Sequence, residues 1–303
     1  MQVVQQRMLV GLIGANIQKS LSPALFEDAC AAVGIRGHYH LMDLDHLAGR
    51  SLEGLLNAAR TAGFRGVNVT YPCKEAVLSL LDSVSAEARQ IGAVNTVVIA
   101  ADGTAMGHNT DRIGFRRSFE EQLGAKSVRG RTATLVGAGG AGRAVAFALF
   151  DLGVDTLLVN DSRPEQAKTL VEALAAHFGP GHAQVASDPE AAISQSAGVV
   201  NATPVGMLGV PGNPIPCRAI TAKHWVADVI YTPLETECIT MARARGARVV
   251  GGAGMCVHQA AETFKLFTGI PADTQRLQRT FAVAAAAREK SLQAGSNRPG
   301  DGP

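Results

Sequence analysis

Long hydrophobic runs are missing from this sequence. The longest apolar run near its start, Met8–Ala15, is broken by Gly11 and Gly14 and leads directly into a loop and a helical pattern. A membrane-spanning helix needs about 20 consecutive apolar residues, and a signal peptide needs an apolar core followed by a small-residue cleavage site. The sequence therefore predicts neither a membrane segment nor a signal peptide, and no membrane partner is expected.

Aromatic residues and charge of one sign are also scarce. Aromatic side chains make up 5% of the 303 residues, the formal net charge is +2, and the basic residues are scattered. Proteins that bind nucleic acid present a basic stripe to the phosphates or an aromatic platform to the bases. We expect no nucleic-acid partner.

Closely spaced cysteines are absent. The cysteines are odd in number, lack a CxxC motif and occur at irregular spacings: Cys30, Cys73, Cys217, Cys238 and Cys256. This usage is typical of buried thiols in a reducing compartment, so a cytoplasmic protein is predicted. His38 and His40 alternate on one predicted strand, but no third ligand stands at zinc spacing, and no metal is expected.

Two alternating α/β units account for most of the chain. Hydrophobic residues make up 47% and charged residues 18% of a chain long enough for two domains. Strand-like and helix-like patterns alternate over Met8–Ala15, Pro23–Val33, His38–Leu44, Ser51–Ala62, Gly66–Thr70, Pro72–Leu81 and Ala93–Ala100. Strand patterns return at Thr132–Val136, Thr156–Asp161, Val199–Thr203, Trp225–Tyr231 and Arg248–Gly251. The predicted fold is α/β, with two domains that share a cleft.

The remaining segments join or complete these units. A helix predicted over Arg112–Glu121 connects them and is expected to act as a hinge. From Met255 the pattern predicts two helices separated near Gly269 and Pro271. The last stretch, Gln293–Pro303, is polar and rich in glycine and proline, and we expect it to be disordered.

A glycine-rich loop marks a dinucleotide site at the start of the second unit. The segment Gly137-Ala138-Gly139-Gly140-Ala141-Gly142 follows a predicted strand and opens a helix of small residues, which is the context that gives the Gly-x-Gly-x-x-Gly pattern its meaning. Gly137 permits the tight turn, Gly139 lets the backbone approach a pyrophosphate, and Gly142 lets helix and strand pack closely. The helix N-terminus then faces the negative charge.

The end of the next strand bears on the choice of cofactor. Asp161 lies about 20 residues beyond the last glycine, where an acid binds the ribose hydroxyls of NAD and repels a 2′-phosphate. Arg163 stands two residues later and can pair with that phosphate or cap the following helix. The charge at Asp161 favours NAD, with NADP as the alternative.

Polar side chains outside the glycine loop suggest a catalytic and an anion site. Pro72 is expected to start a helix that directs Lys74 into the cleft, where Asp111 can meet its amine. Alcohol oxidation needs a hydride acceptor and a group that takes the hydroxyl proton, and a lysine–aspartate pair can be that group. Ser20 and Ser22 place hydroxyls and backbone donors just before a helix, either as an anion site or as a simple cap.

These motifs, taken in order, resemble one family. The resemblance spans nearly the whole chain and includes Ser20–Pro23, Asn68–Lys74, Gly92–Thr96, Gly107–Asp111, Gly137–Gly142, Val200–Pro204, Asp228–Tyr231 with Pro233, and His258–Ala260. The sequence is similar to the shikimate dehydrogenase family, and most similar to its NAD-dependent quinate/shikimate dehydrogenase branch.

The resemblance implies a division of the chain and of its residues. Residues 1–112, completed by helices within 255–290, would form the substrate-binding domain, and residues 113–254 a Rossmann domain with a doubly wound parallel sheet. Lys74 and Asp111 would be the catalytic pair. The substrate carboxylate would lie at Ser20, Ser22 and Tyr231, and the ring hydroxyls at Thr70, Asn95 and Gln259. The nicotinamide end of the cofactor would be lined by Thr203, Val205 and Met207.

The expected function is reversible NAD-dependent oxidation of quinate, shikimate or both to the 3-dehydro ketone, by a monomer or a homodimer. The sequence has Asn160-Asp161-Ser162 where many biosynthetic members have an Asn-Arg-Thr phosphate clamp, and Asn16 and Lys19 where they have proline and histidine. The first departure supports NAD. The second departure leaves the substrate open among quinate, shikimate and an amino relative. Other candidates are an NADP-dependent reductase of 3-dehydroshikimate, an aminoshikimate-type dehydrogenase and a non-catalytic dinucleotide-binding regulator.

Overall fold

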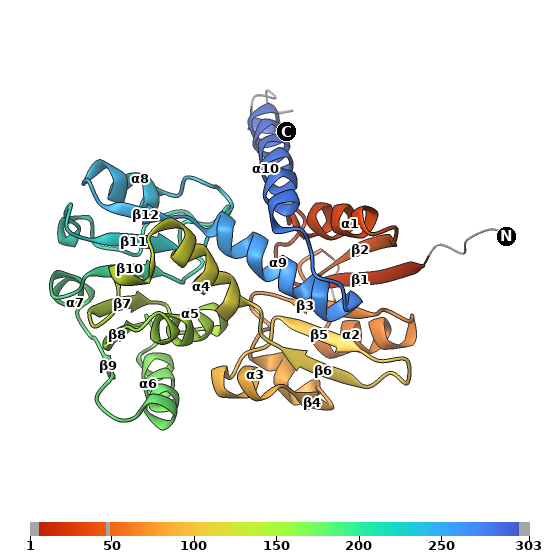
Figure 1. Cartoon of the computed structure of the whole chain (residues 1–303), viewed down its shortest axis with the longest axis horizontal. Coiled ribbons are helices and arrows are strands. Elements are labelled where there is room, and N and C mark those ends of the chain that lie inside the picture. The colour runs from red at the N-terminus through yellow and green to blue at the C-terminus, as the bar shows by residue number, and fades with distance from the viewer. Residues whose placement is uncertain (1–5, 47–48, 297–303) are drawn as a thin grey trace.

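The computed structural model describes residues 6–46 and 49–296. They form two lobes, one around each of two six-stranded sheets, and helix α9 (Gly252–Thr268) crosses between the lobes (Figure 1). Among these residues no helix is long and apolar enough to cross a membrane.

The first sheet is mixed. Its strand order is β2-β1-β3-β5-β6-β4, with β1 parallel to β2 and β3, and with β5 antiparallel to both of its neighbours. The strands are β1 (Arg7–Gly14), β2 (Arg36–Asp43), β3 (Gly66–Val69), β4 (Ser83–Val84), β5 (Thr96–Ile99) and β6 (Ala105–His108). The helices of this lobe are α1 (Ser22–Ala32), α2 (Leu52–Thr61), α3 (Ala86–Ile91) and the 3-10 helix η1 (Ala76–Leu80). All residues of β3 are buried, so this strand carries Asn68 into the interior.

The second sheet is parallel throughout. Its order is β12-β11-β10-β7-β8-β9, which is the 3-2-1-4-5-6 order of a Rossmann sheet when counted from β7. The strands are β7 (Thr132–Val136), β8 (Thr156–Asn160), β9 (Ala183–Val185), β10 (Gly198–Asn201), β11 (Trp225–Asp228) and β12 (Arg248–Val250). Its helices are α5 (Gly140–Asp151), α6 (Pro164–Phe178), α7 (Pro189–Ser194), α8 (Glu237–Ala244) and the 3-10 helices η2 (Ala125–Ser127) and η3 (Cys217–Ala219). The predicted α/β fold with a doubly wound sheet is confirmed.

This sheet order locates a crevice for a ligand. The chain reverses its direction of winding between the neighbouring strands β7 and β10, and in such sheets ligands bind outside the carboxyl ends of the strands at this point. The glycine-rich loop follows β7 directly, so it lies at that crevice.

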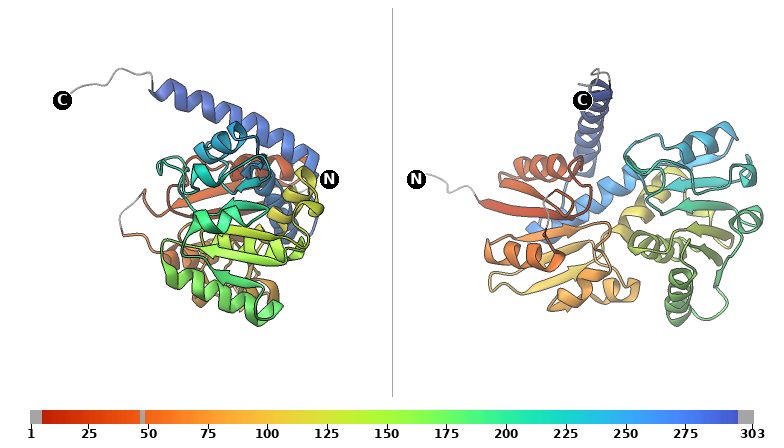
Figure 2. Two further views of the ribbon diagram at one scale, coloured as in Figure 1. Left: turned by 90° about the vertical axis from the view of Figure 1, so that its left-hand side faces the viewer. Right: turned by 180° about the vertical axis from the view of Figure 1, so that it is seen from behind.

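Two helices connect the lobes through packed aromatic side chains. Helix α4 (Asp111–Gln122) carries Phe119, whose ring lies 5.0 Å from the ring of Trp225 in β11. Helix α9 packs along α4 and places the ring of Phe264 5.9 Å from that of Phe26 in α1. The chain then returns to the first lobe as α10 (Thr274–Ser296), which packs on α1 and α9 and ends by projecting from the body (Figures 1 and 2).

The joining segments follow the predicted pattern. The helix expected over 112–121 is α4, and the two helices expected after Met255 are α9 and α10. Of the segment 293–303, predicted to be disordered, residues 293–296 are the last of α10, and residues 297–303 lie outside the described residues.

The expected helix over Pro72–Leu81 is wrong. The Tyr71–Pro72 peptide bond is cis, and only the short 3-10 helix η1 forms, from Ala76. The Lys74 carbonyl accepts a hydrogen bond from the Val94 N–H at 2.8 Å, so it is not available to an α-helical turn. Lys74 therefore lies on a turn that is bonded to a distant segment.

Candidate active site

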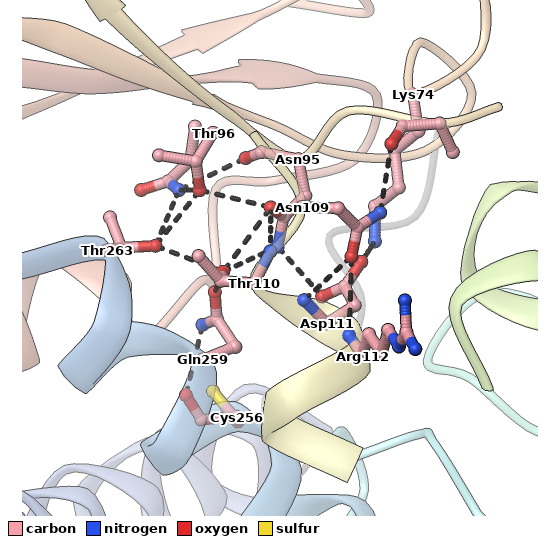
Figure 3. Close-up of polar contacts among 12 residues, drawn as sticks. Lys74, Asn95, Thr96, Asn109, Thr110, Asp111, Arg112, Cys256, Gln259 and Thr263 are labelled. Carbon is pink, nitrogen blue, oxygen red and sulfur yellow. Dashed lines mark hydrogen bonds and ion pairs between the residues drawn. The ribbon is translucent and has the colours of Figure 1, made fainter. Parts of the chain in front are cut away.

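Lys74 and Asp111 meet between the lobes. Lys74 Nζ donates a hydrogen bond to Asp111 Oδ2 at 2.6 Å, and the two side chains are 16% and 6% exposed (Figure 3). Lys74 comes from the turn after β3, and Asp111 is the first residue of α4. The structure thus brings together the two groups that the sequence proposes as an acid/base pair.

The start of α4 is fixed by a residue that sequence reasoning did not assign. Asn109 Oδ1 accepts hydrogen bonds from the N–H groups of Asp111 at 3.0 Å and Arg112 at 3.3 Å. Its amide nitrogen donates to the Ala93 carbonyl at 3.0 Å. An asparagine shortly before a predicted helix is a recognisable capping signal. Here it also fixes the backbone of Asp111.

Asn95 holds the second oxygen of that carboxylate. Its Nδ2 donates to Asp111 Oδ1 and to Thr110 Oγ1, both at 2.9 Å, while its Oδ1 accepts from the Thr110 N–H at 2.8 Å. Asn95 is buried. Both carboxylate oxygens of Asp111 are therefore bonded, and the group has one orientation toward Lys74.

A further polar network lies behind Asn95. Asn68 Nδ2 donates to Thr96 Oγ1 at 3.0 Å and to Thr263 Oγ1 at 3.3 Å, and Tyr39 donates its hydroxyl proton to Asn68 Oδ1 at 2.9 Å. The network links β3 and β5 to α9 (Figure 3). The contacts of Thr96, Thr263 and Tyr39 were not predicted from the sequence, because nothing local shows that these residues meet.

Gln259 and Thr70 stand at two edges of this network. Gln259 Oε1 lies 3.5 Å from Thr110 Oγ1, and its amide nitrogen donates to the Cys256 carbonyl at 3.0 Å (Figure 3). Thr70 follows β3, with its backbone N–H bonded to the Ile13 carbonyl at 3.0 Å. Both are half-buried, so their side chains remain reachable by a ligand.

Ser20 and Ser22 come together before α1. Their hydroxyl oxygens are 3.2 Å apart, and the Ser22 N–H donates to Ser20 Oγ at 3.2 Å. Ser22 is the first residue of α1 and not its cap, since Leu21 holds that position without a side-chain bond. Burial raises the pKa of the Tyr231 phenol, and a side-chain hydrogen bond with Ser20 lowers it in part. Tyr231 is thereby placed beside the serine pair.

The glycine-rich loop has the shape of a phosphate cradle. Gly137 has φ 102°, a conformation that other residues rarely adopt, and a Cβ at Gly142 would overlap the Gly137 carbonyl. A Cβ at Gly139 would meet nothing nearer than 3.8 Å, which leaves room for a ligand there. Gln166 Oε1, 3.9 Å from that position, is buried and has no hydrogen-bond partner in the described part of the chain. The loop fits a dinucleotide.

The loop also lies against Lys74. A Cβ at Gly140 would come within 2.7 Å of Lys74 Cβ, so glycine is required for the two segments to approach. Gly139 caps α5, and Ala138 and Ala141 complete the loop, the first buried and the second half-buried. A cofactor in this cradle would lie next to the Lys74–Asp111 pair.

Asp161 is held by the same loop. Its Oδ2 accepts from the Ala138 N–H at 2.7 Å, and its Oδ1 accepts from the Arg163 N–H at 2.8 Å. Arg163 occupies the capping position of α6, but its side chain makes no cap bond and is exposed. Of the two alternatives for this side chain, helix capping is therefore not observed.

The loop 203–207 follows β10 and is anchored to β11. Asn201 Oδ1 accepts from the N–H and the hydroxyl of Thr203 at 2.9 and 2.8 Å, and Asn201 Nδ2 donates to Asp228 Oδ1 at 3.2 Å. Val205 donates its N–H to Thr203 Oγ1 at 3.1 Å. Burial raises the pKa of Asp228 to about 6. The loop, which ends at Met207, is thus fixed at the crevice.

Asn16 and Lys19 have different surroundings. Asn16 has φ 55° and donates from Nδ2 to the Leu208 carbonyl at 3.3 Å, so it connects the first lobe to the loop that follows β10. Lys19 is exposed. This exposure agrees with the solvent-facing role, one of the two roles left open for Lys19.

A lysine–aspartate pair in contact with a glycine-rich loop is an arrangement suited to hydride transfer. Fold and site define a two-domain, nicotinamide-dinucleotide-dependent oxidoreductase. Residues 12–97 match the family model of the shikimate dehydrogenase substrate binding domain. The chain belongs to the shikimate dehydrogenase family, as the sequence motifs predict.

Relatives in this family cover almost the whole chain. The quinate/shikimate dehydrogenase (NAD(+)) of Corynebacterium efficiens is 46% identical over 90% of this chain and 97% of its own length. The shikimate dehydrogenase (NADP(+)) of Streptomyces avermitilis is 45% identical over 93% of this chain and 98% of its own. Among solved structures, quinate dehydrogenase from Corynebacterium glutamicum in complex with NAD has a TM-score of 0.83 and 42% identity, covering 92% of this chain and 99% of the other.

Proposed function

We propose that this protein catalyses the reversible NAD-dependent oxidation of quinate, shikimate or both to the 3-dehydro ketone. The observation that carries the proposal is the contact between the Lys74–Asp111 pair and the glycine-rich loop. The names of the relatives support the substrate class. They do not choose the cofactor, because NAD- and NADP-dependent relatives are 46% and 45% identical to this chain.

Asp161 supports NAD over NADP. Its carboxylate lies at the end of β8 and is held by the N–H groups of Ala138 and Arg163. A fixed negative charge at this position accepts hydrogen bonds from ribose hydroxyls and repels a 2′-phosphate. Thr203, Val205 and Met207, on the anchored loop after β10, line the nicotinamide end.

The substrate lies across the first lobe. Its carboxylate binds at Ser20, Ser22 and Tyr231, next to the start of α1. Its ring hydroxyls bind Thr70, Asn95 and Gln259, and the reacting hydroxyl meets Lys74. Buried amides and hydroxyls converge behind Asp111. Their hydrogen bonds hold in place the side chains that bind the hydroxyl groups of the substrate ring.

Proton transfer is the task of Lys74. When bound, the nicotinamide supplies the hydride acceptor. In the oxidation direction the neutral Lys74 amine takes the proton of the reacting hydroxyl as the C–O bond gains double-bond character. Asp111 then stabilises the resulting ammonium, and its second oxygen stays bound to Asn95. In reduction the same ammonium returns the proton.

The division of the chain follows from these roles. Residues 1–112 and the helices within 255–290 form the substrate-binding domain, and residues 113–254 form the cofactor domain. The packing of α9 and α10 against α1 supports this division. Four of the five cysteines are buried and all are free, which supports a reducing, cytoplasmic location.

Steady-state oxidation of quinate and of shikimate, each with NAD and with NADP, tests the proposal on one purified sample. At least tenfold better turnover with NAD is expected. Better turnover with NADP would make Arg163 the phosphate ligand and indicate the biosynthetic reductase. No turnover with any of these four pairs would indicate another substrate or a binding protein without activity.

A further inference from the structure

Arg288 on α10 reaches the segment that carries the serine pair. Its guanidinium donates to the Tyr231 carbonyl at 2.9 Å and to the Lys19 carbonyl at 3.4 Å. The residue is 9% exposed, and its Nε is buried without a hydrogen-bond partner in the described residues. One side chain thus joins three parts of the molecule: the loop before α1, the loop after β11 and the last helix.

The charge of Arg288 lacks a counter-ion. None of the ion pairs formed within residues 6–46 and 49–296 includes Arg288. A buried charge without an opposite charge is costly, and protein interiors keep such groups paired or bound to an ion. Two carbonyl oxygens satisfy part of the guanidinium but do not neutralise it. A nearby anion would neutralise the guanidinium charge.

Tyr231 connects this charge to the serine pair. The guanidinium carbon lies 6.0 Å from the centre of the Tyr231 ring. Burial raises the pKa of the Tyr231 phenol, whereas its bond with Ser20 and the charge of Arg288 both act in the opposite direction. The same tyrosine therefore touches the serine pair and feels the positive charge behind it.

We propose that Arg288 is a positioning residue that holds Ser20, Ser22 and Tyr231 together and supplies the positive charge that these three residues need to bind the substrate carboxylate. This inference rests on the proposed function. It assigns this charge to a buried residue of the last helix, whereas Lys19 is exposed.

The test compares a charged substrate with its neutral counterpart. For each variant, kcat/KM is measured for shikimate and for shikimate methyl ester, and the ratio of the two values is the preference for the carboxylate. Arg288→Met removes the charge, and Arg288→Gln removes it but keeps amide donors for the carbonyls. Arg288→Lys retains the charge. Arg279→Met, an exposed arginine on the same helix, is the matched control.

Both neutral variants are expected to lower the preference for the carboxylate about tenfold, mainly through KM. Removing the arginine charge takes away an attraction that the charged substrate has and the methyl ester lacks. Arg288→Lys is expected to keep most of the preference, and Arg279→Met all of it. If Arg288 had only a structural role, its variants would lower kcat/KM for shikimate and for the methyl ester by the same factor. An unchanged ratio in whichever neutral variant folds overturns the inference and leaves the proposed function standing. Wild-type protein that turns over neither quinate nor shikimate overturns both.

Discussion

Lys74 Nζ lies 2.6 Å from Asp111 Oδ2, although the two residues are 37 positions apart and belong to different elements. The partner oxygen of the same carboxylate is bound by Asn95. A carboxylate bonded through both oxygens cannot rotate away without losing a hydrogen bond. Lys74 is therefore held in one geometry relative to Asp111, which suits the proton transfer proposed for it.

Replacing Lys74 by methionine is expected to lower kcat for shikimate or quinate oxidation by about 10²–10⁴-fold. Methionine keeps the stem that packs on Gly140 but cannot take a proton. The dissociation constant for the dinucleotide, measured by calorimetry, should change by less than about threefold.

The control for this change is Lys126→Met, at an exposed position. It should behave as the wild type. If Lys74→Met retained the wild-type kcat, Lys74 would not be the proton acceptor, and equal loss of dinucleotide binding would indicate misfolding.

Asp161→Asn is expected to lower the preference for NAD over NADP by about 10- to 100-fold, because like charges placed together cost several kcal/mol. Asparagine keeps an oxygen for the N–H groups of Ala138 or Arg163, so the loss reports the charge. The measurement is the ratio of kcat/KM for the two cofactors. Asp155→Asn, an exposed carboxylate before the same strand, is the control. An unchanged ratio would remove Asp161 from cofactor selection.

Asn95→Asp is expected to reduce the free energy of unfolding by about 2–3 kcal/mol at neutral pH. The substitution replaces a donor by a carboxylate that faces Asp111 Oδ1 from 2.9 Å, and two carboxylates at that distance repel. Urea unfolding at pH 7 and at pH 5 checks this, with a smaller loss at the lower pH. Asn57→Asp, at an exposed site, should cost much less. A loss independent of pH would mean that repulsion is not the cause.

Asp228 gives a prediction about stability and pH. Burial raises its pKa from 3.8 to about 6, so the folded protein holds this proton more tightly than the unfolded chain. Stability is lost as the pH rises from about 4 to 6, by up to about 3 kcal/mol, and the loss is complete above that range.

Asp228→Asn removes this titration. The difference in unfolding free energy, variant minus wild type, should therefore increase by up to about 3 kcal/mol from pH 4 to pH 7. Chemical denaturation at several pH values measures the difference. A difference that does not vary with pH would contradict a raised pKa at Asp228.

The sequence predicted the features that depend on neighbouring residues. The loop Gly137–Gly142 could be found because its strand, turn and helix are contiguous, and Asp161 because it follows at a fixed interval. The meeting of Lys74 with Asp111 was also expected, since each stands in a recognisable motif. Their functions in catalysis remain predictions.

Features that depend on distant contacts were not predictable. Asn68 meets Thr263 across 195 residues, and Arg288 meets Lys19 across 269. No local pattern marks such pairs. The wrong helix after Pro72 has the same origin, because the bond from Val94 to the Lys74 carbonyl overrides the local preference.

Helix α4 begins at Asp111 and is packed on the second sheet through Phe119 and Trp225. If one lobe rotates against the other about the start of this helix, each atom moves in proportion to its radius from the axis. Atoms at the outer edges of the lobes are far from this axis and move a long way. Asp111 and the Lys74 amine lie close to the axis and hardly move. Opening wide enough to exchange ligands then leaves the Lys74–Asp111 ion pair intact, so the pair does not have to form again when the lobes come together.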